Sequence, residues 1–127
     1  VPEKLLFDKK EFTVEAGRPI EIIVENGDQM QHNLVIGKPK SLEIIGAAAD
    51  KMITMPNGQL RNYVPEIPQV VAATRLINPD ETARLQFVAP TEPGVYPFVC
   101  TFPGHWRVMN GVMRVVKVPV TPANAKK

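Results

Sequence analysis

The sequence CTFPGHWRVM, from Cys100 to Met109, decides how the rest of this chain is interpreted. It contains the only cysteine of the chain, one of its two histidines and one of its five methionines. Pro103 and Gly104 favour a bend inside the stretch, which would bring the residues on either side back toward one point. A thiolate, an imidazole and a thioether, spaced as Cys-x4-His-x3-Met, form a donor set that suits copper in both of its oxidation states.

The same residues allow two other interpretations. Cys100 alone would be a buried structural thiol, because free cysteine is among the most buried residue types. Cys100 and His105 together would also suit a nucleophile beside its base. Such a site needs a third orienting group and an oxyanion hole, which nothing in the sequence marks. A thioether has no acid–base use, so Met109 is explained by a metal site and not by the nucleophile.

A trigonal copper site with a long axial methionine needs two histidines and one cysteine. The only other histidine is His32, in MQHNLVIG, at the start of a predicted strand far upstream. Strand ends that are distant in sequence can meet at one pole of a β-sandwich, so the site would use both histidines. Met113 is a rival for the axial position. It lies inside the predicted last strand, so Met109 is preferred.

Length and composition set the broad class of the protein. The 127 residues suffice for one domain with its own core, predicted as residues 1–119 with a C-terminal tail at 120–127. Thirteen prolines and eight glycines separate short β-branched or alternating runs, which indicates an all-β sandwich or barrel. The net charge of +2, with scattered basic residues, disfavours a nucleic-acid partner.

Two features bear on where the protein works. No apolar run reaches the roughly 20 residues that would span a bilayer, so no transmembrane segment is expected in this chain. The sequence begins at Val1 and not at Met, which suggests a processed product or an excised part of something longer. A single cysteine excludes an internal disulfide and leaves the compartment undefined by cysteine usage.

The periodicity predicts one helix and several strands. Apolar residues recur at helical spacing over 41–53, where Ser41 is a suitable N-cap. The turn at 78–81 predicts that the strands before and after it pair with each other. The predicted strands are residues 5–7, 11–15, 20–26, 32–37, 70–77, 82–88, 95–100 and 111–118.

Several motifs give the chain a family resemblance. It resembles the cupredoxins, the type I blue copper proteins, and among them it is most similar to azurins and auracyanins. The resemblance rests on H-N-L-V at 32–35, G-V-Y-P-F-V-C at 94–100, C-T-F-P-G-H at 100–105 and N-G-V-M-R-V at 110–115. It extends over the predicted helix and thus over most of the chain. It implies a Greek-key β-sandwich of about eight strands with one inserted helix.

The resemblance also implies the roles of individual residues. The metal ligands would be His32, Cys100 and His105 in the equatorial plane, with Met109 in the axial position. A weak axial carbonyl would come from Gln31, where azurins have glycine and where a side chain now needs room.

Further residues would support these ligands by hydrogen bonds. Asn33 and Thr101 match positions that tie the two ligand loops together. The backbone amides of Asn33 and Phe102 would point at the cysteine sulfur and tune the reduction potential. Both cysteines of the azurin disulfide are missing.

The resemblance implies a single-electron transfer protein with one type I copper, which is not an enzyme. Redox partner proteins would dock on an apolar patch around His105, formed by Met30, Phe102 and Trp106. The expected location is periplasmic or extracellular, and the expected state is a monomer. The alternatives are an electron-feeding domain of a larger multidomain oxidoreductase and a copper carrier. This copper site uses both histidines, so none is left for the further copper sites of a multicopper oxidoreductase. The sequence also lacks the methionine or histidine clusters that are usual in copper carriers.

Overall fold

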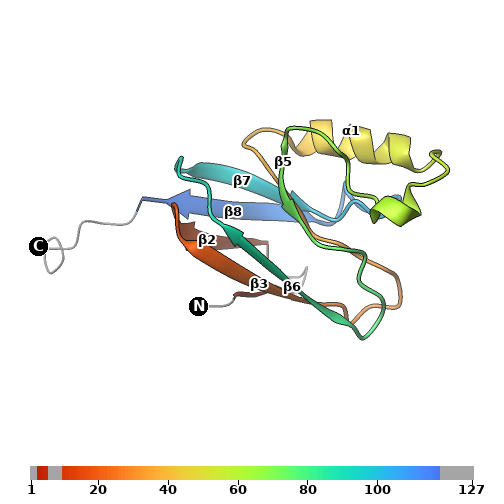
Figure 1. Ribbon diagram of the computed structural model, residues 1–127, viewed down its shortest axis with the longest axis horizontal. Helices are drawn as coiled ribbons and strands as arrows, with labels where there is room; N and C mark the ends of the chain where they lie inside the picture. Colours follow the sequence, from red (N-terminus) through yellow and green to blue (C-terminus); the bar gives the residue numbers. More distant parts are fainter. Residues whose placement is uncertain (1–2, 6–9, 118–127) are drawn as a thin grey trace, which may run out of the picture.

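The computed structural model describes residues 3–5 and 10–117. Within them the chain forms two facing β-sheets of three and five strands, with one α-helix on the outside (Figure 1). This confirms the predicted all-β sandwich with one inserted helix. The predicted boundary between residues 119 and 120 lies outside the described residues, as do residues 6–7 of the first predicted strand and residue 118 of the last.

The smaller sheet has the strand order β1-β3-β6. These strands are β1 (Glu3–Leu5), β3 (Pro19–Glu25) and β6 (Thr82–Val88). β1 runs parallel to β3, whereas β6 pairs antiparallel with β3 over the full length of both strands. Ile22 and Val24 are fully buried on one face of β3, which is the central strand of this sheet.

The larger sheet has the order β2-β8-β7-β4-β5. Its strands are β2 (Glu11–Glu15), β4 (Val35–Gly37), β5 (Val70–Ala73), β7 (Gly94–Val99) and β8 (Asn110–Val116). β2 pairs parallel with β8, and the other neighbours are antiparallel. In β2 the side chains of Phe12 and Val14 are buried and their neighbours are exposed. This alternation is expected of a strand with one face on the core and the other face toward solvent.

Two strand predictions need correction. The predicted pairing of 70–77 with 82–88 is wrong, because β5 pairs with β4 in one sheet and β6 pairs with β3 in the other. The ladder of β5 stops where the Thr74 hydroxyl, and not a backbone carbonyl, accepts the N–H of Leu34. The predicted strand 32–37 is also shorter than expected. His32 forms only an isolated bridge with Ile77 before β4 begins.

The helix α1 (Leu42–Met52) lies where the spacing predicted it and covers the outer face of the larger sheet (Figure 1). It buries Ile45 and Ala49. Ser41 precedes the helix but does not cap it with its side chain, because its hydroxyl donates to the carbonyl of Lys38 at 2.6 Å instead. Within residues 3–5 and 10–117, no helix has the length and apolar character needed to cross a membrane.

The main core lies between the two sheets. Its largest fully buried side chains include Ile22, Leu34, Ile36, Ile77, Phe98 and Met113. Met113 is thus part of the core, as its position inside the last strand predicted.

Candidate metal centre

Three strands of the larger sheet bring the ligand candidates together. The first residues of β4 and of β8 both pair with the last residue of β7, so all three strands meet at one pole. His32 lies just before β4, Cys100 directly follows β7, and Met109 directly precedes β8. The order of the sheet therefore places residues from distant parts of the sequence side by side, at the right-hand end of Figure 1.

The three strongest donors surround one point. The Sγ atom of Cys100 lies 3.7 Å from the Nδ1 atoms of both His32 and His105. One donor atom from each of the three residues lies within 4.8 Å of the other two. A metal ion about 2.3 Å from sulfur and about 2.0 Å from nitrogen, with angles of 110–120°, needs a sulfur–nitrogen separation of roughly 3.5–3.7 Å. The donor positions therefore fit a single ion between them.

Met109 is held at the same pole by the backbone. The N–H of Cys100 donates to the Met109 carbonyl at 2.9 Å, and the N–H of Met109 donates to the His105 carbonyl at 2.8 Å. These bonds close the loop between β7 and β8 at its base. The half-buried Met109 side chain lines a cavity of about 320 Å³ together with His32.

The sulfur of Cys100 lies in an apolar but hydrogen-bonded environment. The side chain is completely buried, and burial raises the pKa of the thiol above its ordinary value. The backbone N–H groups of Asn33 and Phe102 donate to the sulfur and act in the opposite direction, with the smaller effect. Both amides therefore contact the sulfur, and their tuning of the reduction potential stays a prediction. A thiolate at this position needs a cation beside it, as a metal site provides.

The two histidine rings differ in their surroundings. The buried His32 donates its Nε2–H to the carboxylate of Asp28 at 2.9 Å, and this bond is the first cause of the lowered pKa of Asp28. The half-exposed His105 ring lies with its centroid 5.1 Å from that of His32 and 5.1 Å from that of Phe102. Burial, and then the neighbouring His32, lower the pKa of His105. Tyr63 extends this ring cluster, with its centroid 5.8 Å from Phe102.

Several residues at the site have no signal in the sequence. The Asn33 side chain forms two hydrogen bonds with Thr101 and also donates to the carbonyl of Asn62 at 2.8 Å. The Thr101 hydroxyl donates to the carbonyl of Tyr63 at 2.6 Å. Asn62 and Tyr63 both have left-handed backbone angles, with φ of 58° and 54°, which turn their carbonyls toward the ligand strands. Residues 55–68, which surround them, are rich in Pro, Asn and Gly, and this composition indicates only a loop. Asp28 was missed as well, although it lies four residues before His32.

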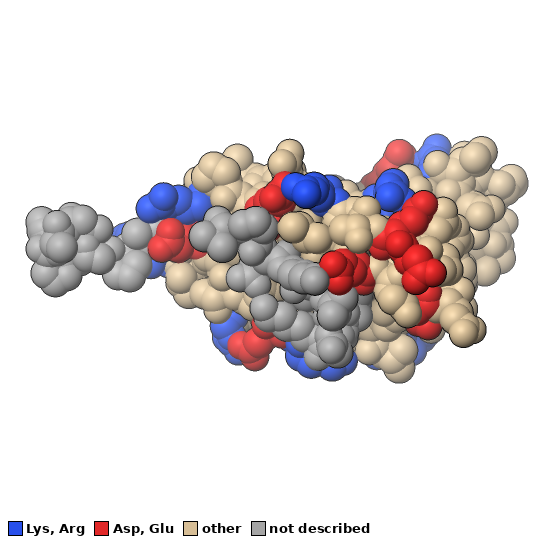
Figure 2. All heavy atoms as spheres, turned by 90° about the horizontal axis from the view of Figure 1, so that it is seen from below, with Lys and Arg blue, Asp and Glu red and all other residues tan. Residues whose placement is uncertain are grey.

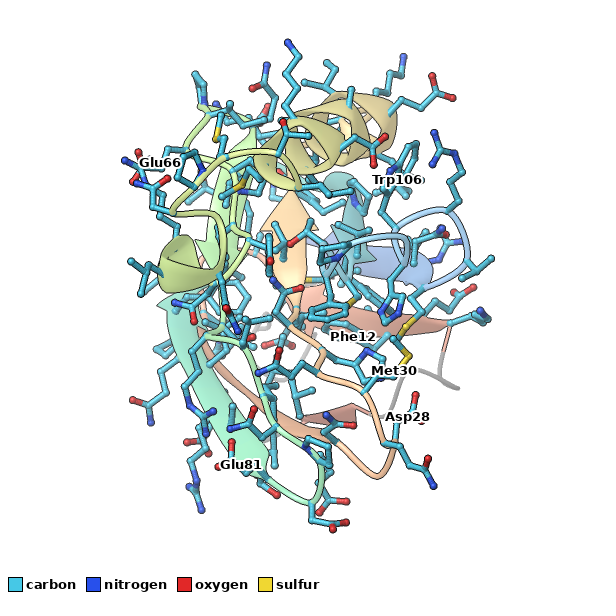
Figure 3. All side chains as sticks on the ribbon, turned by 90° about the vertical axis from the view of Figure 1, so that its right-hand side faces the viewer. Phe12, Asp28, Met30, Glu66, Glu81 and Trp106 are labelled. Carbon is cyan, nitrogen blue, oxygen red and sulfur yellow. The ribbon has the colours of Figure 1, made fainter. Side chains whose placement is uncertain are left out.

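The expected docking residues lie in different environments. Met30 is half exposed, on the loop before β4. Trp106 instead packs against α1, where its indole N–H donates to Asp50 at 3.1 Å and Arg107 lies 4.5 Å above its ring. A side chain at Gly46 of the helix would collide with the indole, so this glycine makes the packing possible. In Figure 3, Trp106 lies beside the helix. Met30 and Asp28 lie on the opposite side of the loop between β7 and β8.

Gln31 and Val108 lie near the ligand candidates in the sequence. The side chain of Gln31 has the room it needs, because its amide N–H donates to the side-chain oxygen of Asn78 at 2.7 Å. An axial contact from its carbonyl stays a prediction. Val108 is 70% exposed and was not predicted as part of the docking patch.

Comparisons with known proteins agree with this site. Residues 2–116 match the family of copper-binding proteins described as plastocyanin/azurin. The chain is 36% identical to auracyanin-A of Chloroflexus aurantiacus over 115 residues, 89% of this chain and 68% of that protein. It is 38% identical to outer membrane protein H.8 of Neisseria meningitidis serogroup B over 88 residues, 68% of this chain but only 45% of that protein.

A solved structure shows the same fold. The "blue" copper protein auracyanin A of Chloroflexus aurantiacus superposes with a TM-score of 0.79 and 30% identity, covering 91% of this chain and all of that one. The match over nearly the whole chain, with the donor cluster at one pole of the sandwich, leads to one conclusion. This chain belongs to the plastocyanin/azurin family of copper-binding proteins.

Proposed function

We propose that this chain is a single-electron carrier in which His32, Cys100 and His105 bind one type I copper, with Met109 as the axial ligand. The observation that carries the proposal is the 3.7 Å spacing from the Cys100 sulfur to Nδ1 of each histidine, which fits one ion between the three donors. Bound copper supplies a one-electron change between Cu(I) and Cu(II). The match to the family over residues 2–116 supports one domain ending near residue 119.

The protein's contribution is to keep the ligands still while the charge changes. His32 is fixed by its backbone bridge to Ile77 and by the bond of its ring to Asp28. Cys100 is fixed by the ladder bond to Met109 and by the amides that donate to its sulfur. Ligands held in this way limit the rearrangement that accompanies each electron transfer.

His105 offers the route by which electrons leave. Its ring is half exposed, and its Nε2 has no hydrogen-bond partner among the residues that the structure describes. Met30, Phe102 and the strongly exposed Val108 lie on the two loops that carry the histidines. Electron-transfer encounters use small interfaces, which such a patch suits. Trp106 supports the loop between β7 and β8 by packing against α1, and it is not a main contact of the docking patch.

Long-range electrostatic attraction contributes little to the association with redox partners. The net charge is +2, and on the face seen in Figure 2 acidic and basic side chains lie interspersed. Weak steering favours an apolar contact as the basis of recognition. We include in the proposal a monomer without enzymatic activity, in the periplasm or outside the cell. The likeness to auracyanin-A and to outer membrane protein H.8 supports this location.

The test is to add one equivalent of Cu(II) to the purified, metal-free chain and record its visible spectrum. We expect an intense band from thiolate-to-copper charge transfer, which is lost in Cys100→Ser while circular dichroism shows an unchanged fold. A chain that stays colourless, or a Cys100→Ser variant that turns blue, contradicts the proposal. Rapid loss of copper to a weak chelator would favour the copper carrier instead.

A further inference from the structure

The loop between β3 and β4 is built around one buried side chain. Asn26 is only 4% exposed, and its amide donates to the carbonyls of Met30 and Ile77, both at 2.8 Å. Its side-chain oxygen accepts the N–H of Asp28 at 2.9 Å. A buried amide that uses three hydrogen bonds to close a loop leaves that loop little freedom. The backbone of Asp28 therefore has a defined position beside the metal centre.

The carboxylate of Asp28 is also held at both oxygens. One oxygen accepts the N–H of Gln29 at 2.7 Å, and the other accepts Nε2–H of His32 at 2.9 Å. An ionised carboxylate can only accept, so the hydrogen of the neutral His32 ring lies on Nε2. This leaves the lone pair of Nδ1 facing the sulfur of Cys100, 3.7 Å away. The contact with Asp28 thus selects the ring form that a metal ion needs.

We propose that Asp28 is a positioning residue for His32, which fixes the orientation and the tautomer of the ring and lowers the reduction potential of the bound copper. A carboxylate that accepts from the far nitrogen of a ligating histidine raises the basicity of the near one. A more basic ligand favours the more highly charged Cu(II). The inference rests on the proposed function, because it concerns the same metal site.

The two histidines are not equivalent in this respect. His105 has no such partner among the described residues, whereas the His32 side chain is 7% exposed and bonded to a carboxylate. The Asp28 side chain itself is 60% exposed. Solvent therefore screens its charge at longer range, and the direct hydrogen bond has to carry the effect.

The test compares the copper-loaded variants Asp28→Asn and Asp28→Ala with Asp50→Asn. Asp50→Asn is the control, because it removes the same charge. The Asp50 carboxylate accepts the indole N–H of Trp106, which lies next to His105 in the sequence. We expect the Asp28 variants to lose about tenfold in the affinity for Cu(II) relative to Cu(I). By the one-electron relation this raises the reduction potential by about 59 mV, as measured by redox titration, while Asp50→Asn shifts it much less.

A second measurement uses the metal-free protein at mildly alkaline pH, where imidazole is neutral. Nitrogen-15 NMR should show His32 as the Nε2–H tautomer in the unchanged chain and as a mixture of tautomers in Asp28→Ala. An unchanged potential in the Asp28 variants, or an equal shift in Asp50→Asn, overturns the tuning role. The same tautomer in both metal-free proteins overturns the positioning role. If no protein turns blue with copper, the proposed function fails, and the NMR result still decides the role of Asp28.

Discussion

Asn33 and Thr101 form two hydrogen bonds with each other, and each of them directly follows a ligand candidate. The Asn33 amide donates to the Thr101 hydroxyl at 2.8 Å, and the Thr101 backbone N–H donates to the Asn33 side-chain oxygen at 2.8 Å. Both residues are almost completely buried. The pair therefore connects the chain at His32 with the chain at Cys100 independently of any metal.

This connection predicts a stability loss in Asn33→Ala. The change leaves the Thr101 N–H and the Asn62 carbonyl without their partner, and each unpaired buried group costs about 1–3 kcal/mol. Urea unfolding of the metal-free chain should show a lower midpoint with little change in slope. Asn57→Ala, at an exposed position, is the control and should stay within about 0.5 kcal/mol of the unchanged chain. Equal midpoints for both variants would contradict this role for the pair.

The axial assignment predicts a difference between two methionines. Met109→Leu should keep copper and raise the reduction potential, because losing a weak donor disfavours Cu(II) more than Cu(I). Met113→Leu is the control, since this fully buried core side chain should change stability by less than about 1.5 kcal/mol and leave the potential nearly unchanged. Redox titration of both variants measures the effect. A strong shift in Met113→Leu alone would reverse the assignment.

The docking patch predicts slower electron exchange in Met30→Glu. A charge at this half-exposed contact must lose water or repel a second copy, so electron self-exchange should slow severalfold while the visible spectrum stays the same. NMR line broadening in mixtures of oxidised and reduced protein gives the rate. Val88→Glu is the control, because Val88 is 64% exposed at the end of β6 that lies away from the metal pole. If both variants exchange as fast as the unchanged chain, electrons leave through another surface.

The buried thiol predicts a loss of stability of the metal-free protein at alkaline pH. Burial raises the pKa of Cys100 in the folded chain above that of the unfolded chain. Its contribution is therefore fully present below the unfolded value of about 8.5 and is lost as the pH rises through the folded value. Unfolding midpoints from about pH 7 to about pH 10 should fall more steeply for the metal-free chain than for metal-free Cys100→Ser. Parallel curves would exclude a contribution from the thiol.

Local patterns in the sequence predicted much of this molecule. The alternation over 11–15 and over 82–88 gave both strands with their observed bounds. The helical spacing over 41–53 placed α1 within one residue at each end. The donor types between Cys100 and Met109 identified the site, because few chemistries use a thiolate, an imidazole and a thioether together.

What the sequence did not reveal depends on contacts between distant residues. A turn at 78–81 shows that the chain reverses, but it does not say that β5 and β6 belong to different sheets. The packing of Trp106 against α1 depends on the space above Gly46, some sixty residues earlier. The bond between Asp28 and His32 is local, yet a carboxylate four residues before a histidine is too common a pattern to indicate a contact.

The hydrogen bond from the Cys100 N–H to the Met109 carbonyl has a consequence for how such proteins diversify. It ends the ladder between β7 and β8, so residues 101–108 begin and end at fixed points of the sheet. A loop with fixed ends is an interchangeable unit, since its length and composition can change without disturbing the register of the strands. Partner choice and reduction potential can then evolve, or be redesigned, by replacing this unit while the scaffold stays the same.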